Sequence, residues 1–141
     1  MRCILHIGTE KTGTSSIQSF LRQNRDVLRS HGILCAKSVG APNNRALPVA
    51  AYSPTRRDEY TQNLGIQTDL QLTAHQEEII AALRDEVAGA GDVDTVIFSS
   101  EHIHSRLTTE GAVERLHRLV ENLQLEEIDI IVYLRNQVAL V

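Results

Sequence analysis

The chain lacks several features that would place it in a common protein class. Its 141 residues include only two cysteines, Cys3 and Cys35, both in apolar surroundings. Two cysteines cannot build a disulfide framework, and no CxxC or Cys/His pattern has the spacing of a zinc site. We therefore expect two reduced thiols in the core.

Basic residues are not in excess, and long apolar runs are absent. The 14 Lys and Arg against 18 Asp and Glu give a formal net charge of −4, which argues against a nucleic-acid-binding protein. No apolar run approaches the roughly 18 residues of a membrane span. Glu10 and Lys11 interrupt the first apolar stretch, so a signal peptide is not expected. These observations predict a cytoplasmic protein without a transmembrane segment.

Residues 4–21, ILHIGTEKTGTSSIQSFL, are the most informative stretch. The apolar start predicts a strand over residues 2–7, and the apolar spacing after the loop predicts a helix over 13–30. A strand, a glycine loop and a helix in this order turn backbone N–H groups and a helix N-terminus toward an anion. An ordinary tight turn with a solvated lysine is the alternative, but glycine spacing, hydroxyl residues and context together favour a phosphate or sulfate site.

The rest of the chain alternates strand and helix patterns. Strands are predicted at 33–36, 94–100 and 128–134, and helices at 73–89, from a Thr73–Gln76 capping box, and from Thr108 or Thr109 onward. All three prolines fall in 37–72, which we interpret as an irregular insertion on the substrate side. The expected fold is one α/β domain over residues 1–141, a three-layer sandwich with a mostly parallel sheet, like the P-loop NTPases.

The loop departs from a nucleotide-triphosphate P-loop, which reads G-x-x-x-x-G-K-[ST]. Gly8 and Gly13 have that spacing, but Thr14 follows the second glycine and Lys11 is the loop's only lysine. Apart from Glu101, no acidic residue ends a strand in a place suited to hold magnesium. The pattern keeps the anion cradle but moves its cation to a position before the second glycine.

Three motifs resemble the sulfotransferases, which transfer a sulfuryl group from 3′-phosphoadenylyl sulfate (PAPS). Residues 10–15, EKTGTS, resemble the 5′-phosphosulfate loop PK-[ST]-G-T-[ST] of that family, and HIGTEKTGTSSIQ looks most like its bacterial branch. Residues 131–136, IVYLRN, are similar to the strand end that supplies an arginine for the 3′-phosphate. Residues 98–102, FSSEH, look like the strand end that carries acid and base residues. The resemblance covers both ends of the chain but not 37–72.

The resemblance implies a PAPS-dependent enzyme that acts without a metal ion. Lys11 would stabilise the bridging oxygen as it leaves, and Glu101 would accept the proton of the acceptor, with His102 or His104 as alternatives. Arg135 would bind the 3′-phosphate. The implied PAPS-binding residues are Gly8, Lys11, Thr12, Gly13, Thr14, Ser15, Ser16 and Arg135. His6, inside the first strand, is interpreted as a packed, hydrogen-bonded residue.

Other functions stay open at this point. The acceptor is expected to be a small molecule or a glycan with a hydroxyl or amine, and an exposed sheet edge can support a homodimer. Because the family's 3′-phosphate serine would fall beyond Val141, we expect the chain to be the N-terminal, nucleotide-binding part of such an enzyme. The alternatives are a P-loop kinase or nucleotide hydrolase with an altered loop, and a non-catalytic binding module that retains the fold.

Overall fold

Strand β1 lies inside a sheet of four parallel strands, in the order β2-β3-β1-β4. The computed structural model describes residues 1–136, so the last five residues of the predicted 1–141 domain lie outside this description. The elements are β1 (Arg2–His6), α1 (Thr14–Gln23), α2 (Arg25–Ser30), β2 (Ile33–Cys35), α3 (Ala46–Ala50), α4 (Glu59–Asn63), α5 (Asp69–Ala88), β3 (Thr95–Ser99), α6 (Glu101–Arg106), α7 (Glu110–Asn122) and β4 (Glu127–Ile131). The predicted α/β class and the parallel sheet are confirmed.

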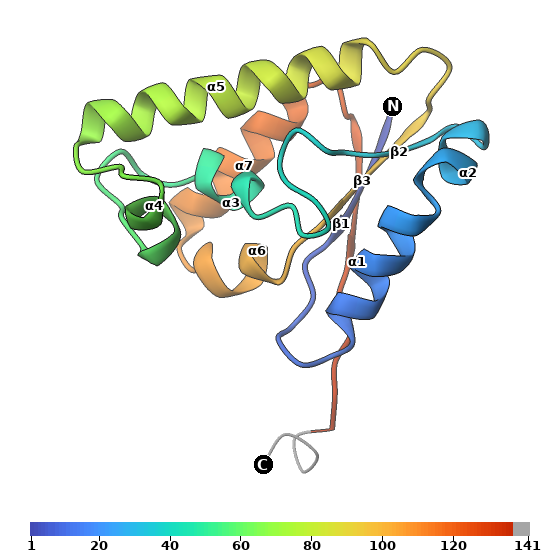
Figure 1. Ribbon diagram of the computed structural model, residues 1–141, viewed down its shortest axis with the longest axis horizontal. Coiled ribbons are helices and arrows are strands. Elements are labelled where there is room, and N and C mark those ends of the chain that lie inside the picture. Colours follow the sequence, from blue (N-terminus) through green and yellow to red (C-terminus); the bar gives the residue numbers. More distant parts are fainter. Residues whose placement is uncertain (137–141) are drawn as a thin grey trace.

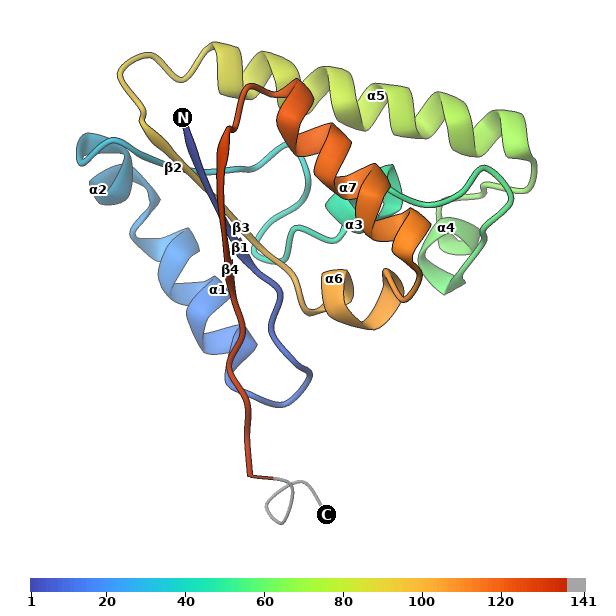
Figure 2. The same cartoon turned by 180° about the vertical axis from the view of Figure 1, so that it is seen from behind.

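Helices cover the sheet on both faces. Figures 1 and 2 show α1 and α2 on one side of the strands, and α3, α5, α6 and α7 on the other. The sides follow from the strand order, since right-handed crossovers that lead in opposite directions along a sheet lie on opposite faces. The crossover from β1 to β2 runs one way, and those from β2 to β3 and from β3 to β4 run the other way. The described part of the chain therefore has three layers.

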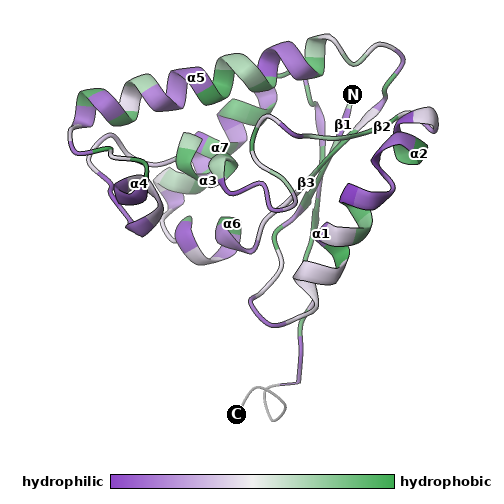
Figure 3. Ribbon diagram, in the orientation of Figure 1, coloured by the Kyte–Doolittle hydropathy of each residue, from purple (hydrophilic) through white to green (hydrophobic). Residues whose placement is uncertain are grey.

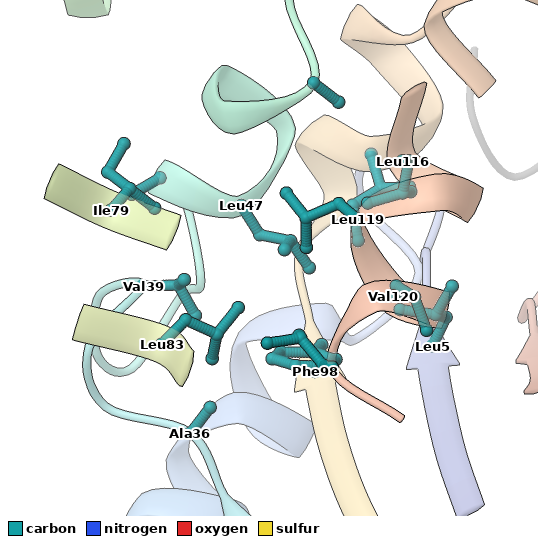
Figure 4. Packing of buried hydrophobic residues seen from close by; sticks show 14 of the residues in the cluster. Leu5, Ala36, Val39, Leu47, Ile79, Leu83, Phe98, Leu116, Leu119 and Val120 are labelled. Atoms are coloured by element: carbon teal, nitrogen blue, oxygen red, sulfur yellow. The ribbon is translucent and has the colours of Figure 1, made fainter. Parts of the chain in front are cut away.

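The main hydrophobic core lies between the sheet and the helices α3, α5 and α7 (Figure 4). In α5, Leu72, Ile79, Leu83 and Val87 recur at helical spacing and are buried, while the rest of that helix is mostly polar (Figure 3). Each such side chain adds about 1.5–3 kcal/mol to the stability of the fold when it is fully buried. This core holds rigid the sheet that carries the candidate site.

Helix α5 begins earlier than predicted because its sequence contains the same capping pattern twice. Thr68 is the N-cap, and its side chain accepts the N–H of Gln71 while the Gln71 side chain accepts the N–H of Thr68. The predicted start at Thr73 is wrong. Gln76, the expected partner of Thr73, instead donates to the carbonyls of Val49 and Tyr52 and ties α5 to α3.

Other boundaries also differ from the predictions. The helix expected over 13–30 is divided at Asn24, whose φ of −102° and ψ of 14° leave the helical range and whose side chain donates to the Phe20 carbonyl. An asparagine side chain competes for backbone groups in this way. The last strand ends at Ile131 rather than near 134. Helix α6 was not predicted at all.

The segment 37–72 is more regular than the irregular insertion that was predicted. It contains α3, α4 and the first turn of α5, and its side chains Leu47, Val49 and Tyr52 are buried in the core. The segment is therefore part of the domain's packing, and it borders the strand ends from within the fold.

Both cysteines are free and buried, as predicted. Burial raises the pKa of Cys3 to about 12, so this thiol stays protonated and inert at neutral pH. In residues 1–136, no helix combines the length and the apolar character that a membrane crossing requires.

Strand β4 forms one edge of the described sheet. Ile130 and Ile131 on this strand are 64% and 38% exposed, and Tyr133 just after it is 52% exposed. An apolar strand edge of this kind can pair with another chain. The homodimer stays a prediction.

Candidate functional site

The carboxyl ends of β1 and β3 meet at a topological switch point. After β1 the chain passes to α1 on one face of the sheet, and after β3 it passes to α6 and α7 on the other face (Figures 1 and 2). Ligands of open α/β sheets bind in the crevice between strands whose connections diverge in this way. The loop after β1 and the first turn of α6 are thus the expected walls of a site.

The loop between β1 and α1 is held by its own threonines. The Thr12 hydroxyl donates to the Thr9 carbonyl at 2.6 Å and accepts the Thr9 N–H at 3.3 Å. The buried Thr14 hydroxyl donates to the same carbonyl at 3.2 Å. Both hydroxyls shape the loop, so in this structure they serve its conformation rather than a ligand. The positive φ angles of Gly8, Lys11 and Gly13 complete the turn.

The N-terminus of α1 leaves backbone N–H groups without acceptors. In the described part of the chain, no protein atom accepts the N–H of Gly13, Thr14 or Ser15. The N–H of Ser16, also expected to bind the anion, donates instead to the Gly13 carbonyl at 3.0 Å. A run of unpaired N–H groups at a helix N-terminus attracts an anion.

A cavity of about 140 Å³ opens beside these N–H groups. Lys11, Gly13 and Ser15 line one side and Glu101 the other, with Glu10 and Thr14 also in its wall. Its side chains include two carboxylates and one ammonium, so attraction for an anion depends on Lys11, the N–H groups and the helix terminus together. Of the predicted cradle residues, Lys11, Gly13, Thr14 and Ser15 line this cavity, whereas Gly8, Thr12 and Ser16 are not part of its wall.

Arg135 lies against the loop although 124 residues separate it from Lys11. Its Nη1 donates to the Lys11 carbonyl at 2.9 Å, and its side chain is exposed. The Thr9 hydroxyl donates to the carbonyl of Tyr133, which adds a second contact between loop and β4 extension. The fold thus brings the predicted 3′-phosphate arginine to the predicted phosphosulfate loop.

Glu101 is the first residue of α6 and is held by two amides. Its Oε2 accepts from Gln18 Nε2 at 2.8 Å, and its Oε1 accepts from Asn43 Nδ2 at 3.1 Å. Each carboxylate oxygen keeps a further lone pair, so Glu101 can still accept a proton. The side chain is 22% exposed and faces the cavity beside Lys11.

His102 lies next to Glu101, whereas His104 does not. The Nδ1 of His102 is 4.0 Å from Glu101 Oε1 and accepts from the Asn43 amide at 3.3 Å, which assigns the ring proton to Nε2. Burial, and after it the charge of Arg45, lowers the pKa of His102, so the ring is neutral at pH 7. His104 instead lines an apolar groove on the far side of α6. Neither histidine lines the cavity of Lys11 and Glu101, and their catalytic role stays a prediction.

His6 is buried and hydrogen-bonded, as interpreted from the sequence. Its Nδ1 lies 2.7 Å from Ser99 Oγ, and its ring meets that of Tyr133 edge-on at 5.7 Å. Burial lowers its pKa, with the negative charge of Glu101 acting in the opposite direction. The residue fastens the ends of β1, β3 and β4 together beneath the loop.

Gln18 and Asn43 were missed by the sequence analysis. Gln18 is buried on the inner face of α1, four residues after the buried Thr14. A polar pair at i and i+4 beside a glycine loop is the signal that could have indicated it. Asn43 carried no such signal, because its place beside Glu101 depends on the path of residues 37–45.

Gly8 is the position where a side chain would disturb the site most directly. A Cβ atom there would lie 3.1 Å from Thr14 Oγ1 and 3.4 Å from Glu101 Cβ, at a φ of +59°. We expect Gly8→Ala to lower the free energy of unfolding by about 1–2 kcal/mol from the left-handed backbone alone. It should also weaken anion binding, because Thr14 or Glu101 must move. Chemical denaturation and calorimetry with adenosine 3′,5′-bisphosphate measure the two effects.

Gly65→Ala is the matched control. Gly65 has a φ of +77° but no atom within 4 Å of an added Cβ. Gly65→Ala should therefore lower the free energy of unfolding by a similar amount, from the left-handed backbone, without changing anion binding. Equal behaviour of the two variants in both measurements would contradict the crowding at Gly8.

Among residues 1–136 no group of three or more His, Cys, Asp or Glu side chains could hold a metal ion. The metal-independent site stays a prediction. Comparisons of the chain with models of protein families, with curated proteins and with solved structures gave no match.

Proposed function

We propose that the chain is the nucleotide-binding part of a PAPS-dependent sulfotransferase, with a fold like that of the P-loop proteins. The observation that carries the proposal is the row of N–H groups at Gly13, Thr14 and Ser15 that lack a protein acceptor and face a cavity shared with Lys11 and Glu101. The loop follows an inner strand and opens a helix, which is the strand–loop–helix order of P-loop proteins. The motif resemblance supplies the identity of the anion.

The position of the loop's lysine supports a phosphosulfate tail over a triphosphate. Lys11 precedes Gly13, and Thr14 takes the place of the lysine that follows the second glycine in a nucleotide-triphosphate loop. Lys11 also holds a φ of +61°, a conformation that costs a non-glycine residue about 1–2 kcal/mol. Such strain concentrates at functional loops.

The proposed transfer is an in-line displacement at sulfur. The acceptor hydroxyl gives its proton to the Glu101 carboxylate, its oxygen bonds to sulfur, and the bond from sulfur to the bridging oxygen breaks. Negative charge then builds on the bridging oxygen of adenosine 3′,5′-bisphosphate, where Lys11 and the N–H groups would stabilise it. Gln18 and Asn43 hold the Glu101 carboxylate in one orientation, which favours the reaction by positioning.

Glu101 is favoured as the base over His102 by their contacts. Glu101 lines the same cavity as Lys11, whereas His102 lines a neighbouring one. The Asn43 amide already donates to the Nδ1 of His102. His102 is the second candidate because its neutral ring can accept a proton at Nδ1 if Asn43 turns away.

Calorimetric titration with adenosine 3′,5′-bisphosphate and with PAPS, in EDTA, tests the proposal. Both should bind without magnesium, and ATP with magnesium should bind more weakly. Preference for ATP with magnesium would replace the proposal with a P-loop kinase or hydrolase. If none of the three binds, and Lys11→Ala alters nothing but stability, the chain is a non-catalytic module.

A further inference from the structure

A second cavity, of about 210 Å³, lies beside the predicted phosphosulfate cavity. Arg45, Asp58, Tyr60, His102 and Arg106 contribute to its wall. The two cavities are neighbours, since Glu101 lines the first, His102 lines the second, and these two side chains are 4.0 Å apart. We call this second cavity the arginine pocket.

The carboxylate of Asp58 already accepts three hydrogen bonds. Its Oδ2 accepts from Arg45 Nη2 at 2.6 Å and from the Tyr52 hydroxyl, and its Oδ1 accepts the Thr61 N–H at 3.0 Å. Burial alone would raise the pKa of Asp58, but these hydrogen bonds lower it to about 2. Arg45 is held as well, since its guanidinium also lies over the Tyr60 ring at 4.5 Å. This part of the pocket is prearranged and nearly neutral.

Arg106, in contrast, has guanidinium N–H groups that can donate to a ligand. Its Nε forms an ion pair with Asp58 Oδ2 at 3.9 Å, too long for a hydrogen bond, and its Nη1 makes the one side-chain hydrogen bond of Arg106 among residues 1–136, to Ser105 Oγ at 3.4 Å. A guanidinium has five N–H donors. Its side chain is 37% exposed, so the group is accessible from the pocket. The positive charges of Arg45 and Arg106 both act on His102 and help to lower its pKa.

The remaining acidic side chain in the wall is Glu59, and it is exposed. Exposed charges are screened by water and salt more than half-buried ones. An anion that enters the pocket therefore meets the fork of Arg106 with the Asp58 charge already neutralised by Arg45.

We propose that the arginine pocket binds the acceptor, and that the acceptor is itself an anion carrying a carboxylate or a sulfate. This inference rests on the proposed sulfotransferase function. The planar fork of Arg106 fits either group in a two-pronged contact. An acceptor fixed in this way places a neighbouring hydroxyl toward Glu101 and His102, at the junction of the two cavities. The pocket is small, so it takes one acidic unit, such as a single uronate ring of a glycan.

Matched small probes test the charge requirement. Sodium glucuronate and glucuronic acid methyl ester differ in one charge, and N-acetylglucosamine 6-sulfate and N-acetylglucosamine form the equivalent sulfate pair. NMR titration of the chain, with and without adenosine 3′,5′-bisphosphate, measures each affinity. At least one anion should bind about ten times more tightly than its neutral partner, the effect expected of a charge-assisted contact. Whichever pair shows the difference identifies the anionic group.

Arg106→Gln should lower the affinity for the preferred anion about tenfold or more and leave bisphosphate binding unchanged. Arg106→Lys keeps the positive charge but lacks the planar fork, so its affinity for the anion should lie between those of the unmodified chain and Arg106→Gln. Arg118→Gln removes an exposed arginine of α7 that, among residues 1–136, pairs only with Glu114, and it should bind the anion as tightly as the unmodified chain does. Thermal unfolding of each variant establishes that it folds.

Three outcomes would overturn the acceptor proposal: equal binding within both pairs, no binding of either anion, or no loss in Arg106→Gln beyond Arg118→Gln. Failure of the bisphosphate to bind is a separate result, and it would refute the sulfotransferase proposal. Anion binding that depends on Arg106 would then still establish the arginine pocket as an anion site, although not as an acceptor site.

Discussion

Replacing Lys11 by alanine should reduce sulfuryl transfer by about 10²–10³-fold while lowering the affinity for PAPS, in which the bridging oxygen is still uncharged, much less. The expected loss is this large because, in the part of the chain that the structure describes, Lys11 is the one ammonium group in the cavity wall, and the charge it would stabilise is absent from PAPS and develops in the transition state. Transfer rates at saturating PAPS, measured on an enzyme form with established activity, together with PAPS titration in the absence of an acceptor, separate the two effects.

The chain offers a direct control for this variant. Lys37 is the only other lysine in the sequence, and it is exposed and outside the cavity. Lys37→Ala should keep full activity. Arg135→Ala should behave in the opposite way to Lys11→Ala, with bisphosphate affinity about 10–100-fold weaker, since Arg135 is assigned to the 3′-phosphate. Equal losses of PAPS affinity in both variants, without a specific loss of transfer in Lys11→Ala, would refute these separate roles.

Replacing Asp58 by alanine should lower the free energy of unfolding by about 3–5 kcal/mol, as expected when one partner of a mostly buried ion pair is removed. Asp58 and Arg45 have side chains only 14% and 13% exposed, so Arg45 would keep a charge without a counterion. The change also removes the N-cap of α4, because the Asp58 side chain accepts the Thr61 N–H. The melting temperature should fall by about 10 °C.

Two further variants isolate the ion pair as the cause. Asp69, the first residue of α5, also pairs with an arginine, Arg57, but it is 62% exposed and does not cap the helix, so Asp69→Ala should lower the free energy of unfolding by less than about 1 kcal/mol. The double variant Arg45→Met, Asp58→Ala removes the stranded charge and should be more stable than Asp58→Ala alone. If the double variant is the less stable of the two, the buried charge does not explain the loss.

The pH dependence gives an independent check on the same ion pair. The pKa of Asp58 is lowered from 3.8 to about 2, so the folded state binds a proton less readily than the unfolded state. The stability that Asp58 supplies is therefore constant above about pH 4 and is lost as the pH falls through 2. Chemical denaturation at pH 7 and at pH 2 measures this effect. The difference in free energy of unfolding between the unmodified chain and Asp58→Ala should be smaller at pH 2 than at pH 7.

Local sequence patterns predicted an element correctly where the pattern allowed only one position for it. Apolar runs predicted the strands β1, β2 and β3. The Thr109 cap and the apolar residues at helical spacing predicted α7. The start of α5 could not be decided locally, because Thr68–Gln71 and Thr73–Gln76 carry the same signature. Tertiary contact decided it, since Gln76 is used to bind α3.

The candidate site divides in the same way. By itself the sequence determined the loop that we propose binds an anion, since glycines 8 and 13, the hydroxyls and Lys11 lie close together along the chain, and backbone conformation depends on such neighbours. Only the tertiary structure decided which distant groups meet the loop. Parallel pairing of β1 with β3 and β4 brings Glu101 and Arg135 to it, and the fold of 37–72 supplies Asn43 and the arginine pocket. Those contacts join residues tens of positions apart, and no periodicity or spacing in a single chain records them.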